Sequence, residues 1–157
     1  MAVHTFTLFA DYFQIYLQDE GAPGIDGDSW SRDATERMLA VAPRALAVGT
    51  VRNVCVPVSV EILASEPPDD LKEWDHVTEC SLTTTSGKLV VAGCTDYLPD
   101  AARIEIAPGT YRARISGGGF NSVVKRWEGG ADKYRVRLWP GSEVEPRVLK
   151  KRRPQST

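Results

Sequence analysis

The sequence predicts a mainly β fold, an antiparallel two-sheet β-sandwich with one amphipathic α-helix. Short runs of alternating apolar and polar residues recur along the chain, and turn signals separate them at spacings of about 8–12 residues, as expected of a sandwich. The helical period appears in one stretch only, residues 31–42. With 157 residues, of which 42% are hydrophobic and 25% are charged, the chain is large enough to bury a core.

The clearest strand covers residues 12–19. Alternation of side chains along a strand places Phe13, Ile15 and Leu17 on one face, and we expect this apolar face to be buried in the core. The opposite face carries polar or amphipathic side chains: Tyr12, Gln14, Tyr16 and Gln18. This face suits a half-exposed sheet surface or a binding surface, because tyrosine combines a large apolar body with a polar tip.

The remaining strands follow from alternation and from turn signals such as Ser86-Gly87 and Pro108-Gly109. They are expected at residues 3–9, 45–50, 53–64, 74–85, 88–95, 103–107, 110–115 and 133–139. Pro57 lies inside one of them and predicts an edge strand or a bulge, since proline donates no ladder hydrogen bond.

The single helix is predicted from about Ser31 to Ala42, with its apolar side against the sheet. Asp28 or Ser29 is expected to cap its start, and Pro43 ends it. The residues that carry the helical spacing are Trp30, Ala34, Met38 and Val41.

The chain is expected to form one sandwich domain over residues 1–140. Residues 141–157 show no periodicity and contain the basic run Lys150-Lys151-Arg152-Arg153 before Pro154. This segment is therefore predicted to be a flexible basic tail.

The net charge is −2, but the charges are unevenly distributed. Residues 1–75 hold 13 acidic against 5 basic side chains, whereas residues 76–157 hold 8 against 14. Such asymmetry marks an interaction surface, or it disappears when folding mixes the two halves.

The sequence contains no recognisable catalytic set, so a non-enzyme is expected. GxSxG, HExxH and P-loop patterns are absent, and His76 with Cys80 is the nearest approach to a zinc-binding pair. No metal or cofactor is expected. No secretory signal or run of ~20 apolar residues is present, and Cys55, Cys80 and Cys94 form no CxxC pair, which together favour a reduced, cytoplasmic protein without membrane attachment.

Several motifs occur in an order that resembles the competence protein J family, small inhibitors of a DNA-entry nuclease. They are Tyr12 to Gln14, Tyr16 and Asp19, Trp30 and Ala34, Arg52-Asn53, Trp74 to Val77, Gly87, Leu89, Leu98-Pro99 and Pro108 to Arg112. The similarity spans roughly residues 5–115, and the sequence departs from the family's pattern after Ile115.

The resemblance implies a non-catalytic protein that binds and blocks a nuclease or a toxin-like enzyme. Acidic and aromatic groups would face a site built for polyanions, and charge complementarity would speed encounter. The expected partner-binding residues are Tyr12, Gln14, Tyr16, Asp19, Glu20, Asp26 and Asp28. Alternatively, the two tyrosines pack under the helix or the C-terminal strands, and Arg52-Asn53 is simply turn chemistry.

Three other readings stay open. Four tryptophans, Trp30, Trp74, Trp127 and Trp139, are consistent with a small-ligand or carbohydrate-binding sandwich. An enzyme of unrecognised type ranks last, because nucleophile–base sets are absent. A nucleic-acid binder would rest on the basic C-terminal half, but nucleic acid is not the expected partner.

Overall fold

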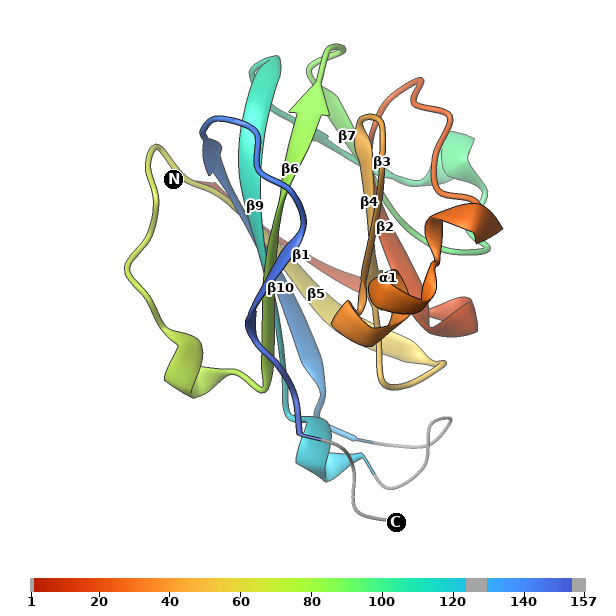
Figure 1. Cartoon of the computed structure of the whole chain (residues 1–157). Helices are drawn as coiled ribbons and strands as arrows, with labels where there is room; N and C mark the ends of the chain where they lie inside the picture. Colours follow the sequence, from red (N-terminus) through yellow and green to blue (C-terminus); the bar gives the residue numbers. More distant parts are fainter. Residues whose placement is uncertain (1, 124–129, 154–157) are drawn as a thin grey trace.

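The computed structural model describes residues 2–123 and 130–153, which form two packed β-sheets with one α-helix beside the second sheet (Figure 1). The first sheet has the strand order β1 (Ala2–Phe9), β5 (Cys55–Ile62), β10 (Lys133–Pro140), β9 (Gly109–Gly118), β6 (His76–Thr84) and β11 (Arg147–Lys150). The second sheet has the order β3 (Leu39–Ala42), β4 (Ala45–Gly49), β2 (Gln14–Asp19), β7 (Lys88–Gly93) and β8 (Ala102–Glu105). Short 3-10 turns connect them: η1 (Asp11–Phe13), η2 (Gly27–Ser29), η3 (Leu71–Glu73), η4 (Leu98–Asp100) and η5 (Phe120–Ser122). The predicted two-sheet sandwich with one helix is confirmed.

The core lies between the sheets and follows the predicted alternation. Ile15 and Leu17 of β2 are buried in the main hydrophobic cluster, as are Val56 and Val60 of β5. Each such aliphatic side chain contributes about 1.5–3 kcal/mol by leaving water.

Pro57 lies in an interior strand, so the predicted edge strand or bulge is wrong. β5 pairs antiparallel with β1 and parallel with β10. Pro57 faces Thr7 in a pair that exchanges no ladder hydrogen bonds, because Ala10 donates to Val54 and bonded pairs alternate from there. The missing N–H therefore points away from β1, and the pairing with β10 begins only at Val58.

The helix is shorter than predicted, because α1 spans Arg32–Arg37. Ser31 caps it, accepting a hydrogen bond from the Ala34 N–H at 3.2 Å, and Met38 ends it in the left-handed conformation with φ 59°. The next four residues, all apolar, form β3 instead and pair with β4, which buries Leu39 and Ala40 completely. Ala34 packs on the outer face of the second sheet with Ala40 and Ala47, so the predicted helix–sheet contact is present.

The C-terminal segment differs from the predicted flexible tail. Residues 147–150 form β11, which pairs antiparallel with β6 at the sheet edge. The strand escapes the alternation test because it has four residues and no buried side chain among them. Residues 154–157 lie outside the described part of the chain.

Candidate functional site

A pocket of about 520 Å³ opens where the start of β2, the end of β4 and the end of α1 meet. Half of its lining residues are aromatic or aliphatic, and one is a cation from the C-terminal segment. The lining residues are Tyr12, Phe13, Gln14, Trp30, Thr35, Met38, Gly49, Thr50, Val51 and Arg152. We refer to it as the aromatic pocket.

Three residues of the aromatic pocket have left-handed backbone conformations that are rare outside glycine: Tyr12, Phe13 and Met38, with φ of 56°, 60° and 59°. The chain therefore does not continue β2 through residues 12–13 as predicted, but turns at η1. Tertiary hydrogen bonds hold the turn: Phe13 N–H donates to Asn53 Oδ1 at 3.3 Å, and its carbonyl accepts from Thr50 N–H at 2.9 Å. Strained backbone of this kind persists only where the surrounding structure maintains it, and it is found most often at binding and active sites.

The side chain of Gln14 links the pocket wall to the sheet through hydrogen bonds. Its Oε1 accepts from Trp30 Nε1–H at 2.8 Å and from the Tyr16 hydroxyl at 2.9 Å. The Tyr16 hydroxyl also lies 3.1 Å from Cys94 Sγ, and its ring packs against the Ala34 cluster. Burial and this contact with Cys94 raise the pKa of Tyr16 above its usual range. Of the two alternatives for the tyrosines, packing under the helix therefore describes Tyr16.

Tyr12 is the exposed aromatic of the predicted set, with 69% of its surface accessible. Glu20, Asp26 and Asp28 are exposed as well. They belong to residues 20–36, which we call the acidic segment and which also carry exposed Asp33 and Glu36 against a single basic residue, Arg32. The structure thus groups four of the seven predicted site residues at the surface and leaves Gln14, Tyr16 and Asp19 inside or half inside.

Within the acidic segment, three carboxylates already have intramolecular partners, and one of them, Glu36, forms a 3.4 Å ion pair with Arg32 one helical turn away. Asp26 caps η2, accepting from Ser29 N–H at 3.1 Å, and Glu20 forms a 3.6 Å ion pair with Arg103. Asp28 and Asp33 are exposed to solvent.

Asp19 is fully buried and anchors the turn between β6 and β7. Its carboxylate accepts from the Thr84 hydroxyl at 2.6 Å, from the Ser86 hydroxyl at 2.6 Å and from Arg44 Nη1 at 2.9 Å. The hydroxyl and N–H of Thr85 and the N–H of Ser86 donate as well. Burial alone raises the pKa of Asp19, but these hydrogen bonds outweigh it and hold the pKa well below its ordinary range. Asp19 is therefore a structural carboxylate.

The C-terminal segment reaches the aromatic pocket through His76 of β6, which is 4% exposed. Its Nδ1 accepts from the Arg152 N–H at 3.0 Å, so Nε2 carries the proton and donates to the Arg37 carbonyl at 2.7 Å. The ring thus joins the end of α1 to the residue whose side chain lines the pocket.

We expect His76 to make the protein less stable in mild acid. Burial lowers its pKa, and the charges of Arg152 and Lys151 act in the same direction, whereas the Arg37 carbonyl opposes them. Since the unfolded chain takes up the proton first, stability is complete above about pH 6.5 and falls as the pH drops from there through the lower folded-state pKa. Urea unfolding at pH 8 to 5 measures this.

His76→Gln is the test variant, because an amide can donate and accept without titrating in this range. It should flatten the pH dependence between pH 6.5 and 5, while His4→Gln should leave it unchanged. An unaltered slope in His76→Gln would contradict the assignment.

Two polar networks were not foreseen from the sequence. In the first, Asp132 is fully buried and accepts hydrogen bonds from Arg52 Nε and from the Tyr134 hydroxyl at 2.8 Å. The Tyr134 hydroxyl in turn accepts from the Val51 N–H at 2.8 Å, on the floor of the aromatic pocket. Arg52 therefore forms a buried ion pair and is not simply a residue of a turn.

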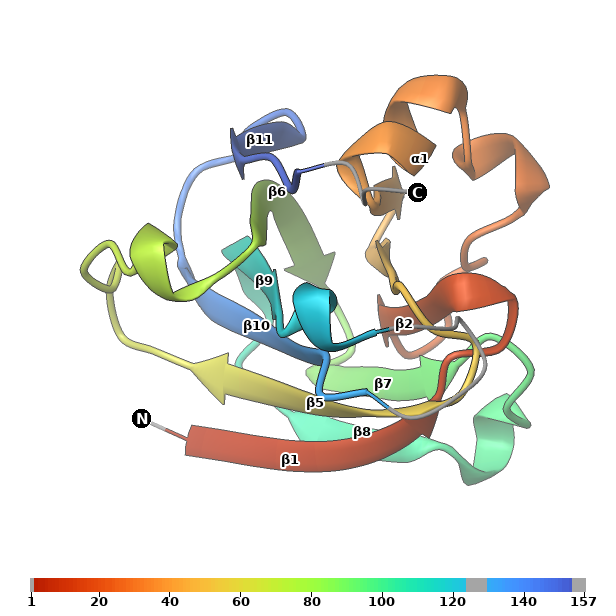
Figure 2. The ribbon, with the colours of Figure 1, turned by 90° about the horizontal axis from the view of Figure 1, so that it is seen from below.

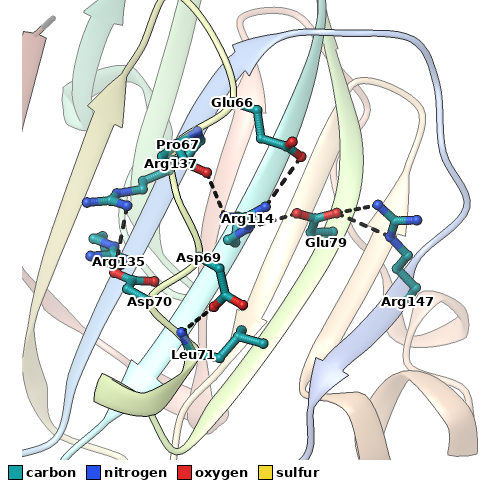
Figure 3. A network of polar contacts seen from close by, with 10 residues as sticks. All are labelled: Glu66, Pro67, Asp69, Asp70, Leu71, Glu79, Arg114, Arg135, Arg137 and Arg147. Atoms are coloured by element: carbon teal, nitrogen blue, oxygen red, sulfur yellow. Dashed lines mark hydrogen bonds and ion pairs between the residues drawn. The ribbon is translucent and has the colours of Figure 1, made fainter.

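The second network covers the outer face of the first sheet (Figure 3). Glu79 lies between Arg114 at 2.8 Å and Arg147 at 2.6 Å, and Asp70 pairs with Arg135 at 2.6 Å. Arg114 stacks on Trp139 and Arg135 on Trp74. These arginines are engaged within the protein, so this basic face does not present a row of free cations to a phosphate backbone.

The three described tryptophans, which raised the alternative of a carbohydrate-binding sandwich, do not line a common surface. Trp74 and Trp139 are buried beneath the arginines, with 8% and 4% of their surfaces exposed, whereas Trp30 lines the aromatic pocket. Trp127 lies outside the described residues.

The described residues contain no group of three His, Cys, Asp or Glu side chains placed to hold a metal ion. His76 and Cys80 make separate contacts, His76 with backbone groups and Cys80 with the core. The three cysteines are free thiols. No helix in the described parts of the chain has the length and hydrophobicity to cross a bilayer.

Comparison with known proteins places the fold. No family model matches the sequence, and no curated protein is similar to it. The structure is similar to ComJ from Bacillus subtilis, an inhibitor of the DNA-degrading activity of NucA, with a TM-score of 0.65 and 14% identity over 90% of this chain and 96% of that one. It is also similar to a protein named crocagin biosynthetic gene J, with a TM-score of 0.61 and 19% identity over 90% of this chain and 100% of that one. At these identities the likeness establishes the fold, and at the level of the fold it supports the resemblance to the competence protein J family.

Proposed function

We propose that this protein is a non-catalytic inhibitor that binds a nuclease or a similar enzyme acting on a polyanion. The observation that carries the proposal is the acidic segment, where five exposed carboxylates stand against one arginine beside the exposed Tyr12. The fold supports it, because ComJ, an inhibitor of a nuclease, has the same architecture.

The physical mechanism is mimicry of charge. A nuclease site attracts phosphates with basic side chains, so a fixed array of carboxylates is drawn to the same place and speeds encounter. Tyr12 stands at the rim of the aromatic pocket with its backbone held in a left-handed turn, which suits an anchor that loses little entropy on binding. Bound in this way, the inhibitor excludes nucleic acid sterically and electrostatically.

The test begins with affinity purification of the tagged protein from its native extract and identification of what binds. The isolated partner is then titrated with the protein while its hydrolysis of DNA is followed. A stoichiometric loss of activity that weakens as salt rises is expected, since exposed charges are screened. Recovery of no nuclease or toxin-like enzyme in repeated experiments would count against the proposal.

Charge-reversal variants test whether the acidic segment is the surface that binds the partner. The triple variant Asp28→Lys, Asp33→Lys, Glu36→Lys keeps the Asp26 cap, and we expect it to weaken inhibition by about tenfold or more, mainly through slower association. The matched control reverses three exposed acids elsewhere, Asp100, Glu143 and Glu145, and changes the net charge equally. Equal losses in both variants would show that only net charge matters. Tyr12→Ala should cost about 2 kcal/mol of binding if Tyr12 is an anchor.

The aromatic pocket favours a second candidate function, binding of a small molecule. Its volume of about 520 Å³ lies within the range of roughly 300–1,000 Å³ that is typical of ligand sites, and Trp30 offers a ring for stacking. A carbohydrate or other small ligand should change tryptophan fluorescence in the wild type and not in Trp30→Phe. A glycan array without hits, together with unchanged fluorescence, would remove the carbohydrate version.

A further inference from the structure

β1 is a sheet edge without the usual protection. Natural sheet edges avoid pairing with other chains by being short, or by carrying charges, proline or bulges. β1 has eight residues, Ala-Val-His-Thr-Phe-Thr-Leu-Phe, with no Asp, Glu, Lys, Arg, Pro or Gly. It pairs with β5 along its whole length without a shift in register.

The other sheet edges differ from β1 in this respect. β3, β8 and β11 have four residues each. β3 is contacted by α1, and β8 carries the opposite charges Arg103 and Glu105. β11 carries Arg147 and Lys150, and its register with β6 is irregular. In Figure 2, β1 lies at the margin of its sheet beside β5.

A hydrogen bond just beyond the end of β1 shows which residues of β1 bond to β5. Ala10 N–H donates to the Val54 carbonyl at 3.0 Å, in the same register as the β1–β5 pairing. In an antiparallel pair the bonded residues alternate, so the even-numbered residues of β1 bond to β5. The N–H and C=O groups of Val3, Thr5 and Thr7 therefore point away from the sheet.

These outward groups are accessible at one end of the strand and covered at the other. Val3 is 53% exposed, and Thr5 and Thr7 are exposed as well. The carbonyl of Phe9 lies against Gly93 of β7, so close that a Cβ built on Gly93 would come within 2.0 Å of it. The open edge thus runs from Val3 to Thr7, with Thr5 at its centre.

We propose that this edge pairs antiparallel with the same edge of a second copy of the chain, about a twofold axis through Thr5. Val3 then lies opposite Thr7 of the second copy, Thr5 opposite Thr5, and Thr7 opposite Val3. All three pairs have outward amides on both sides, so each exchanges two ladder hydrogen bonds. The register sets threonine opposite threonine at the axis, a favourable cross-strand pair, and brings no like charges together.

The contact is self-complementary, which a twofold homodimer requires and an arbitrary partner strand does not. One pair of strand edges is small beside the roughly 1,200–2,000 Å² that stable interfaces bury. The dimer is therefore expected to form at high protein concentration and to dissociate on dilution.

Sedimentation velocity over a wide concentration range, with amide hydrogen exchange by NMR, tests the pairing. The mass should double at high concentration, and the amides of Val3, Thr5 and Thr7 should gain protection in parallel. The amides of His4, Phe6 and Leu8 should be protected at all concentrations, because they bond to β5. A monomer throughout, or doubling without protection of the outward amides, would overturn the proposal.

Thr5→Pro removes the central outward N–H and no ladder bond to β5, so it should give a folded monomer at every concentration. Thr5→Lys is the second variant, should proline disturb the strand, since it sets two ammonium groups face to face at the axis. Thr5→Val keeps the backbone and should dimerise like the wild type. A dimer that persists in folded Thr5→Lys uses another surface. If the wild type stays monomeric but binds another protein, and Thr5→Lys no longer binds that protein, the edge pairs with a strand of the other protein. Either of these two results refutes the twofold pairing.

Discussion

Asp19→Ala should lower the free energy of unfolding by about 3–5 kcal/mol, because several hydrogen bonds to one buried, charged carboxylate are lost together. The carboxylate holds Arg44 and three consecutive residues of the β6–β7 turn, Thr84 to Ser86. Without it, the buried Thr84 hydroxyl and the donors of Thr85 and Ser86 lose their acceptor, and the turn that joins the two sheets loosens. Urea unfolding followed by circular dichroism measures the change.

Glu20→Ala is the matched control for Asp19→Ala, because Glu20 is the next residue and is exposed. It should change stability by no more than about 0.5 kcal/mol. The pair of variants also separates two roles that the sequence does not distinguish, since a loss of partner binding in Asp19→Ala with unchanged stability would place Asp19 at the interface after all.

Asp132→Ala is expected to cost a similar amount, about 3–5 kcal/mol, because it removes the carboxylate that pairs with the buried Arg52 and accepts from Tyr134. The damage should extend to the aromatic pocket, since Tyr134 also holds the Val51 N–H. Unfolding in urea, with pocket integrity followed by tryptophan fluorescence, is the measurement.

Tyr134→Phe should be milder, at about 1–3 kcal/mol, because only the Val51 amide and one carboxylate oxygen lose a partner. If Asp132→Ala unfolds like the wild type, the ion pair contributes nothing to stability.

The strands were predictable because alternation is a local signal. Val56, Val58 and Val60 face the core as their spacing requires. The helix was overextended because residues 39–42 are apolar throughout and fit either period; pairing with β4, a tertiary contact, decided it. β11 was missed because it has no buried residue and therefore shows no alternation of apolar and polar side chains.

The candidate site was predictable only in part. The exposed acids and Tyr12 belong to one stretch of sequence, so their grouping is visible there. The remainder of the pocket depends on residues far apart in the chain, such as Met38, Val51 and Arg152. Asp19 and Glu20 are adjacent acids, and only the position of the β6–β7 turn makes one a structural anchor and leaves the other at the surface.

The parallel pairing of β5 with β10 has a consequence for synthesis on the ribosome. β10 sits between β5 and β9 and joins the two halves of the first sheet. β5 ends at Ile62 and β10 begins at Lys133, so the inner edges of β5 and β9 stay unpaired until the last sixth of the chain is synthesised. A nascent chain stalled before β10 would present both edges at once, and such a species is prone to aggregation. The interval between the synthesis of β9 and that of β10 is therefore the period in which the nascent chain exposes the most unpaired strand edge.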